Sequence, residues 1–120
     1  MRVAVCCPEP KEALWICSKI EERAAMTHMS AETVSFPSEN ALWQVFEPGR
    51  FRGAVVGYGD MRGFLCARRM REEDRGCRVI LLDDTDRYAI RGLRIHLTDY
   101  LVRPLEEKRF CAAVDHLFTE

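Results

Sequence analysis

The residues of this sequence that could do chemistry stand where buried apolar runs end. Cys7 ends the first run and Gly57 ends a run in the middle of the chain, whereas Asp83 and Arg103 directly follow two later runs. In an open parallel sheet, the carboxyl ends of the strands meet at one edge, and binding sites form there. We therefore expect Cys7, Gly57 and Asp83 to converge, which would bring a thiol and a carboxyl group into one site.

Cys7 is the residue of this group that could act as an enzyme nucleophile. A cysteine directly after the first strand can carry a phosphoryl group or attack a phosphate ester if backbone N–H groups cradle the phosphate. The segment Pro8-Glu9-Pro10 offers few such donors, because each proline lacks its N–H. Tyrosine-phosphatase loops also require a nearby downstream arginine, and Glu12 and Ala13 stand there. A cysteine phosphocarrier or phosphatase is therefore a remote alternative, and we predict a buried structural thiol.

The elements that must position these residues follow from the alternation of apolar runs with helical patterns. Nearly unbroken apolar runs are typical of strands buried on both faces of a parallel sheet, and apolar residues three or four positions apart indicate one face of a helix. Strands are predicted over residues 2–7, 32–36, 53–57, 78–82 and 100–102. Helices are predicted over 11–28, from a cap at Ser38 through Phe46, over 61–74, from a cap at Asp84 or Thr85, and from Pro104 onward.

Five successive strand–helix units predict a flavodoxin-like (βα)5 fold, a doubly wound parallel sheet of the α/β class. Right-handed crossovers restrict the topology, and strand order 2-1-3-4-5 is the flavodoxin-like solution. No repeat or linker interrupts the pattern, so residues 1–120 are expected to form a single domain. The last helix is expected to bury Phe110, Val114 and Leu117.

The composition of the chain excludes several functional classes. The formal net charge of −1 lacks the basic footprint of a nucleic-acid-binding domain. The six cysteines show no C-x-x-C spacing and only three histidines accompany them, so we expect free, mostly buried thiols and neither a zinc site nor a redox motif. The amino-terminal apolar run is too short for a signal peptide or a membrane span, which predicts a cytoplasmic protein without membrane contact.

Segments in the second half of the chain carry a resemblance to a known family. Asp99–Pro104 reads D-Y-L-V-R-P and looks like a D-Y-L-x-K-P ending of the fifth strand, and Asp86–Ala89 is similar to a D-x-Y-A start of the fourth helix. From Met61 to Leu105, the sequence thus resembles a response-regulator receiver domain, in particular the subtype that precedes LytTR DNA-binding domains. The further segments that resemble this family are Met61–Phe64, Arg69–Glu72 and Cys77–Leu82.

The resemblance implies a phosphotransfer site that this chain does not complete. The family needs two acids after strand one and an aspartate after strand three, which bind Mg²⁺ and accept the phosphoryl group; here Cys7, Pro8 and Gly57 occupy these places. A small hydroxyl residue and a lysine follow strands four and five in the family, and here Asp83 and Arg103 stand there. We therefore predict a pseudo-receiver, meaning a receiver fold without phosphotransfer chemistry, which is not an enzyme and needs no cofactor.

Asp60 supports an alternative function for the same edge of the sheet. It is the only acid between the third strand and the third helix, so a shifted alignment would make it the phosphoryl acceptor, with Mg²⁺ as cofactor. Otherwise Asp60 is the N-cap of the third helix or a solvated loop acid. The sequence therefore leaves a phospho-accepting receiver as the second candidate.

Asp83, Tyr100 and Arg103 are the residues through which a pseudo-receiver could hold one state. We hypothesise that Arg103 forms a bidentate ion pair with Asp83, which would replace the lysine–phosphoryl contact of the family; alternatively, Asp83 caps the fourth helix with Asp84. Tyr100 stands where the family has its switch aromatic, and it is either locked or part of a partner surface. By the same resemblance, the Arg103–Pro104 bond is expected to be cis.

The expected function is protein–protein regulation in two-component-type signal transduction, without phosphorylation. The resemblance implies a homodimer or a protein partner bound through the fourth helix, fifth strand and fifth helix, and a histidine kinase is a further candidate partner. DNA would be contacted only through a LytTR output domain that is missing from this chain. Charged residues on this face, which could instead form a solvated surface, are Arg87, Arg91, Arg94, Asp99, Glu106 and Glu107.

Overall fold

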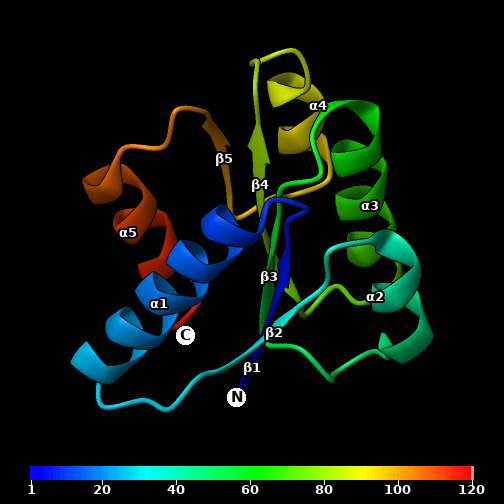
Figure 1. The fold of residues 1–120 in the computed structure, drawn as a ribbon. Helices are drawn as coiled ribbons and strands as arrows, with labels where there is room; N and C mark the ends of the chain where they lie inside the picture. Colours follow the sequence, from blue (N-terminus) through cyan, green and yellow to red (C-terminus); the bar gives the residue numbers. More distant parts are fainter. Residues whose placement is uncertain (120) are drawn as a thin grey trace.

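A five-stranded parallel sheet forms the centre of the structure, a computed structural model that describes residues 1–119 (Figure 1). The strand order is β2-β1-β3-β4-β5, which confirms the flavodoxin-like (βα)5 prediction. The elements along the chain are β1 (Arg2–Cys6), α1 (Pro10–Met26), β2 (Glu32–Ser35), α2 (Glu39–Val45), β3 (Gly53–Val56), α3 (Asp60–Glu73), β4 (Arg78–Asp83), α4 (Ala89–Arg94), β5 (Asp99–Val102) and α5 (Glu107–Asp115).

The helices cover the sheet in two layers, with α1 and α5 on one face and α2, α3 and α4 on the other (Figure 1). Alternate side chains of each strand point toward the two helical layers, because successive residues of a strand face opposite sides of the sheet. Val3 and Val5 belong to the core under α1 and α5, whereas Ala4 and Cys6 belong to the core under the other three helices. The helix α5 completes the first core with Phe110 and Val114, and Leu117 follows just after the end of the helix. All three side chains are fully buried as predicted.

The helix α1 brings its first turn to the carboxyl edge of the sheet. Pro10 opens the helix at a position where its missing N–H costs nothing, and the Glu9 carboxylate caps it by accepting the backbone N–H groups of Lys11 and Glu12 at 3.1 Å and 2.7 Å. One face buries Ala13, Ile16, Ile20 and Ala24. Within residues 1–119, no helix is long and apolar enough to cross a membrane.

The helix α4 begins later than the sequence analysis predicted, at Ala89 rather than beside Asp84 or Thr85. The carboxyl group of Asp83 accepts the backbone N–H of Asp84 at 2.7 Å, which favours a turn over a helix start. Tyr88 then turns inward and stacks on Phe64, with 5.1 Å between the ring centroids. The segment between β4 and α4 is therefore a structured loop over the carboxyl edge.

The helix α5 also begins later than predicted, at Glu107 rather than at Pro104. Glu106 is its N-cap, with extended dihedral angles of φ −88° and ψ 126°. Leu105 packs against the core under α1 and α5, so the chain crosses this edge in extended form before the helix starts. The Arg103–Pro104 bond is cis, as the resemblance implied.

Candidate functional site

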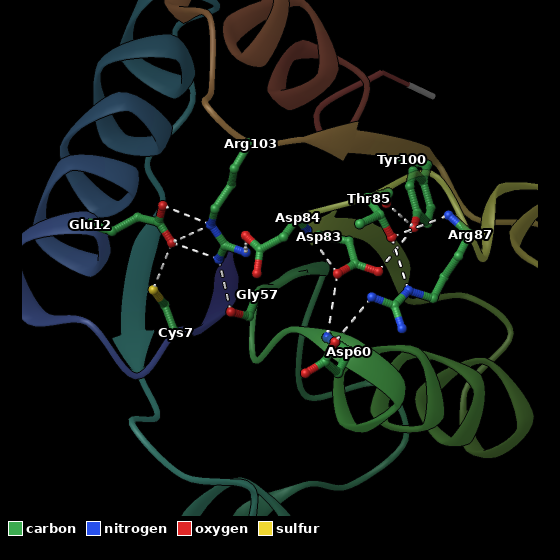
Figure 2. A network of polar contacts seen from close by, with 10 residues as sticks. All are labelled: Cys7, Glu12, Gly57, Asp60, Asp83, Asp84, Thr85, Arg87, Tyr100 and Arg103. Carbon is green, nitrogen blue, oxygen red and sulfur yellow. Dashed lines mark hydrogen bonds and ion pairs between the residues drawn. The ribbon is translucent and has the colours of Figure 1, made fainter.

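The carboxyl edge of the sheet gathers the residues selected from the sequence, but it divides them into two groups (Figure 2). One group surrounds the Arg103 guanidinium next to α1, and the other surrounds the Asp83 carboxyl group next to α3. Cys7 and Gly57 meet in the first group as expected, whereas Asp83 does not join them. The first group comprises Cys7, Glu12, Gly57 and Arg103, and the second comprises Asp60, Asp83, Thr85 and Tyr100.

The guanidinium group of Arg103 is the centre of the first group. Its Nη2 donates to Glu12 Oε1 at 2.7 Å and to the Gly57 carbonyl oxygen at 2.8 Å, and its Nε donates to Glu12 Oε2 at 3.0 Å. Asp84 adds a longer contact of 3.5 Å to Nη1. Only 20% of the Arg103 side chain and 22% of the Glu12 side chain are exposed, so solvent and salt screen this ion pair less than a surface pair. The network joins α1 to the ends of β3 and β5.

Gly57 leaves room for this guanidinium because it has no side chain. A Cβ atom at this position would lie 2.8 Å from Arg103 Nη2 and 3.5 Å from Leu82 Cδ1. The first of these contacts is shorter than real Cβ atoms make, so any side chain at residue 57 requires Arg103 to move. The Arg103 guanidinium thus lies in the space that a side chain at residue 57 would take.

Glu12 is the site residue that the sequence analysis missed. The hydrogen bonds from the Arg103 guanidinium hold the pKa of Glu12 below its usual range, and Glu12 in turn raises the pKa of Arg103. The available signal was its place in the first turn of α1. In this topology that turn starts from the same edge of the sheet at which the residue after β5 emerges.

Cys7 is a buried thiol beside the same ion pair. Its Sγ donates to Glu12 Oε1 at 3.1 Å. Burial, together with this hydrogen bond, raises the pKa of Cys7 to about 11, so the group is a neutral thiol rather than a nucleophilic thiolate at physiological pH. Pro8 follows as an exposed residue that supplies no donor. These features disfavour the cysteine enzyme, and all six cysteines, which lie within residues 1–119, are free thiols as predicted.

Asp83 is directed away from Arg103, and our hypothesis of an ion pair between them was wrong. Its side chain is 2% exposed. Its Oδ1 accepts the backbone N–H groups of Asp84 at 2.7 Å and Asp60 at 3.3 Å, and its Oδ2 accepts the hydroxyl of Tyr100 at 3.0 Å. Asp83 therefore holds two backbone segments at once, the loop before α4 and the first turn of α3. It does not cap α4, whose N-cap is Tyr88, so the alternative of a cap shared with Asp84 was also wrong.

The ring of Tyr100 is turned toward Asp83 (Figure 2). Its hydroxyl group lies 3.0 Å from Asp83 Oδ2 and 2.7 Å from the carbonyl oxygen of Thr85, which also accepts it. Burial and the neighbouring Asp83 carboxyl group raise the pKa of Tyr100 to about 12. Tyr100 thus links β5 to the loop before α4, and its role as a switch aromatic stays a prediction.

Asp60 is an exposed acid at the start of α3 rather than its N-cap. Gly59, with φ of +83°, is the cap, and Asp60 is the first helical residue, with φ of +51°. Few non-glycine residues adopt such a value, and the hydrogen bond from its backbone N–H to Asp83 supports it. Its side chain is 78% exposed and lies 3.4 Å from Arg87 Nη2. The N-cap expectation was therefore wrong, whereas the expectation of a solvated acid is confirmed.

The carboxyl groups at this edge do not fit a Mg²⁺ ion, which the receiver fold implies. Mg²⁺ requires oxygen ligands in near-octahedral geometry, but Glu12 is engaged by Arg103 and Asp83 by two N–H groups and a hydroxyl. Asp60 points outward to Arg87. Throughout the described residues, no three histidine, cysteine, aspartate or glutamate side chains are placed to hold a metal ion. These carboxyl groups are therefore engaged in contacts within the protein.

Comparison with known proteins shows a likeness in fold. No protein-family model matches the sequence, and no curated protein matches it. Among solved structures, the response regulatory domain of mrkE from Klebsiella pneumoniae is similar with a TM-score of 0.78 and 17% identity, over 98% of this chain and 94% of that chain. A putative pilus assembly protein, cpaE from Burkholderia thailandensis, is similar with a TM-score of 0.76 and 10% identity, over 100% and 99%.

A longer response regulator shows the same likeness over part of its length. DrrB from Thermotoga maritima, an OmpR/PhoB homologue, is similar with a TM-score of 0.68 and 19% identity. The match covers 92% of this chain and 49% of DrrB, so the chain spans about half of that protein. The fold is therefore that of response-regulator receiver domains, as the order of the strands had indicated.

Proposed function

We propose that this chain is a pseudo-receiver, a receiver-like signalling domain that regulates a protein partner without accepting a phosphoryl group. The observation that carries the proposal is the Arg103 guanidinium, which fills the space beside Gly57 and donates to the Gly57 carbonyl oxygen. A phosphoryl group in this place would need a cation to neutralise its charge. Here Glu12 already neutralises the Arg103 guanidinium. The protein's own carboxylate thus takes the place of the negative charge that a phosphoryl group would bring.

Phosphoryl acceptance by Asp60 is the second candidate function. Its exposed side chain is the observation in its favour, because a phosphodonor could reach it. Two features oppose it: Arg87 is its charged neighbour in place of a metal ion, and the acids nearby are engaged in other contacts. A conventional acceptor works with Mg²⁺ held by further carboxylates.

Intact mass after incubation with acetyl phosphate and Mg²⁺ tests the proposal directly. We expect no phosphoryl adduct, because residue 57 has no nucleophile and, within residues 1–119, no carboxylate set is arranged for Mg²⁺. A phospho-accepting receiver treated in parallel shows that the donor is active. An adduct that disappears in Asp60→Asn but persists in Asp86→Asn, a control at another exposed acid, would refute the pseudo-receiver and establish Asp60 as the acceptor. An adduct lost only in Cys7→Ser would support the cysteine enzyme.

The surface formed by α4, β5 and α5 supports regulation through contact with a protein. Ile90 and Leu93 on α4 are 70% and 77% exposed, and apolar side chains that protrude together often mark an interface. Several charged residues expected on this face are paired within the chain, which leaves the apolar contacts to drive association. These internal pairs are Arg87 with Asp60, Asp99 with Arg109, and Glu107 with Lys19.

Replacement of Leu93 by aspartate is expected to weaken association through this surface about tenfold or more, because a charge would be buried in an apolar contact. Sedimentation velocity over a range of concentrations measures it for a homodimer. Leu14→Asp is the matched control, since Leu14 is 73% exposed on the opposite helical layer. Equal effects of the two changes would contradict the proposed surface, and a wild-type monomer at every concentration would limit the proposal to a partner other than a second copy.

We also propose that this chain acts in two-component signalling. This assignment is supported by the D-Y-L-V-R-P and D-R-Y-A segments and by the likeness in fold to response regulators. On this proposal, a LytTR DNA-binding output domain or a histidine kinase would be the partner, and DNA would be contacted only through the output domain. The likeness to a pilus assembly protein makes partner binding in another type of assembly the competing assignment.

A further inference from the structure

A groove rich in arginine lies at the carboxyl-terminal ends of α3 and α4, away from the Arg103 site. It has a volume of about 320 Å³, at the lower end of the range of roughly 300–1,000 Å³ that is usual for ligand pockets. Its charged lining comes from the end of α3, the turn that follows it and the end of α4, and Ile95 and His96 complete the lining. The residues that carry the argument are Arg68, Arg71, Glu72, Arg75, Arg94 and Ile95.

Arg71 fixes the groove in place. Its Nε donates to the carbonyl oxygen of Ile95 at 3.1 Å, and its Nη1 donates to the carbonyl oxygens of Arg75 at 2.8 Å and Cys77 at 2.6 Å. These bonds tie the end of α3 to the end of α4 and to the start of β4. The groove is therefore a formed feature of the fold rather than a chance gap between side chains.

The groove carries more positive charge than its own residues neutralise. Arg68 lies 3.8 Å from Glu72, which is the one carboxylate of the lining. Within residues 1–119, Arg75 and Arg94 form no ion pair, and both side chains are exposed. Four guanidinium groups thus face a single carboxylate in a chain whose net charge is −1. Like charges gathered in a concave surface create a local potential that attracts anions.

We propose that this arginine groove binds an acidic peptide segment of a protein partner. Guanidinium groups bind carboxylates with paired hydrogen bonds, and Arg75 and Arg94 are available for this. Both helices end at the groove, where helix carbonyl groups carry partial negative charge. A peptide suits this mixture because its carboxylates accept from arginine while its backbone N–H groups can donate to carbonyl oxygens. Ile95 adds apolar contact for the stems of acidic side chains.

Nucleic acid and compact inorganic anions fit the groove less well. His96 is the aromatic side chain of the lining, so successive unpaired bases would lack the row of stacking partners that single-stranded nucleic acid uses. The chain has a sequence pI near 6.3, unlike a domain that follows a phosphate backbone. A small phosphate anion has no N–H groups for the carbonyl ends of the helices. The groove shares no residue with the Arg103 site, so peptide binding to the groove is independent of phosphoryl uptake.

Fluorescence anisotropy with a fluorescein-labelled octapeptide of alternating glutamate and alanine tests the proposal. We expect saturable binding at low ionic strength that weakens as salt is added, because the contacts are ionic. Arg75→Glu with Arg94→Glu is expected to weaken binding about tenfold or more. The control, Arg62→Glu with Lys108→Glu, changes the net charge equally at exposed residues outside the groove, and we expect it to bind nearly as the wild type does.

Three results would overturn the proposal. Wild-type protein that fails to bind the peptide at low ionic strength would remove its basis, and equal losses in the two charge-reversed proteins would indicate attraction to net charge alone. Stronger binding of a short DNA duplex than of the peptide, lost in the groove variant, would assign the groove to nucleic acid. Circular dichroism of each variant shows that the fold is kept, which the exposure of all four side chains leads us to expect.

Discussion

Replacement of Arg103 by alanine is expected to lower the free energy of unfolding by about 2 to 4 kcal/mol, because it leaves a shielded carboxylate and a carbonyl oxygen without their donor. Glu12 would lose its ion pair, and the Gly57 carbonyl oxygen would lose a hydrogen bond of 2.8 Å. Breaking a fully buried pair costs more, but about a fifth of each side chain is in contact with water, so we place the value toward the lower end.

Urea unfolding followed by circular dichroism measures this change, and Arg109→Ala provides a matched control. Arg109 also forms a double hydrogen bond with a carboxylate, that of Asp99, at 2.6 Å and 2.8 Å. Half of its side chain is exposed, and surface pairs contribute about 0 to 1 kcal/mol. If the two alanine variants lose the same stability, Arg103 is one more surface charge and the site has no special structural role.

The pH dependence of stability gives a second view of the same ion pair. Arg103 lowers the pKa of Glu12 in the folded state, so the folded protein binds this proton less readily than the unfolded chain does. The stabilisation is fully present above the ordinary glutamate pKa of about 4.3 and is lost as the pH falls through the lowered value. Glu12→Gln should therefore flatten the acid limb of the stability curve relative to the wild type. An unchanged acid limb would contradict the role of Glu12.

Most of the fold could be predicted from the sequence because each strand is an apolar run bounded by residues that break it. The strand ends were within a residue or two of the structure, and the buried face of α1 and the burial of Phe110 matched the pattern. The starts of α4 and α5 could not be read in this way. Each depends on a contact far apart in sequence, such as the hydrogen bond from Tyr100 to the carbonyl oxygen of Thr85.

The sequence analysis placed the site at the correct edge of the sheet but paired Asp83 with Arg103, which the structure does not. The alternation of side chains along each strand explains the difference. Leu101 faces the core under α1, and Arg103, two residues later, emerges on the same side. Leu81 and Tyr100 belong to the core under α3 and α4, and Asp83 follows Leu81 with the same parity. Successive side chains of a strand point to opposite faces, so Asp83 and Arg103 emerge on opposite sides of the sheet. The parity of the two strands therefore favours separate partners for these two residues.

Replacement of Asp83 by alanine is the second change with a large expected effect, a loss of about 2 to 4 kcal/mol of unfolding free energy. The reason is that one buried side chain satisfies three donors, namely the N–H groups of Asp60 and Asp84 and the hydroxyl of Tyr100, and buried donors without an acceptor are costly. Asp86→Ala, at an exposed acid of the same loop, should stay within about 0.5 kcal/mol of the wild type. Equal effects would show that Asp83 is not a structural acceptor.

The titration of Tyr100 tests whether Asp83 also holds the Tyr100 ring in place. The pKa of Tyr100 is raised to about 12, so its stabilising contribution is present below the ordinary tyrosine pKa of about 10 and is lost as the pH rises through about 12. Tyr100→Phe should remove the part of the alkaline loss of stability that the Tyr100 hydroxyl causes. The part that other titrating groups cause should remain. Asp83→Asn should lower the pKa of Tyr100 in an ultraviolet titration, because it removes a negative neighbour while burial persists. If the titration of Tyr100 does not change, Asp83 caps the two loops but does not govern the aromatic ring, and the lock must lie in the Thr85 carbonyl contact alone.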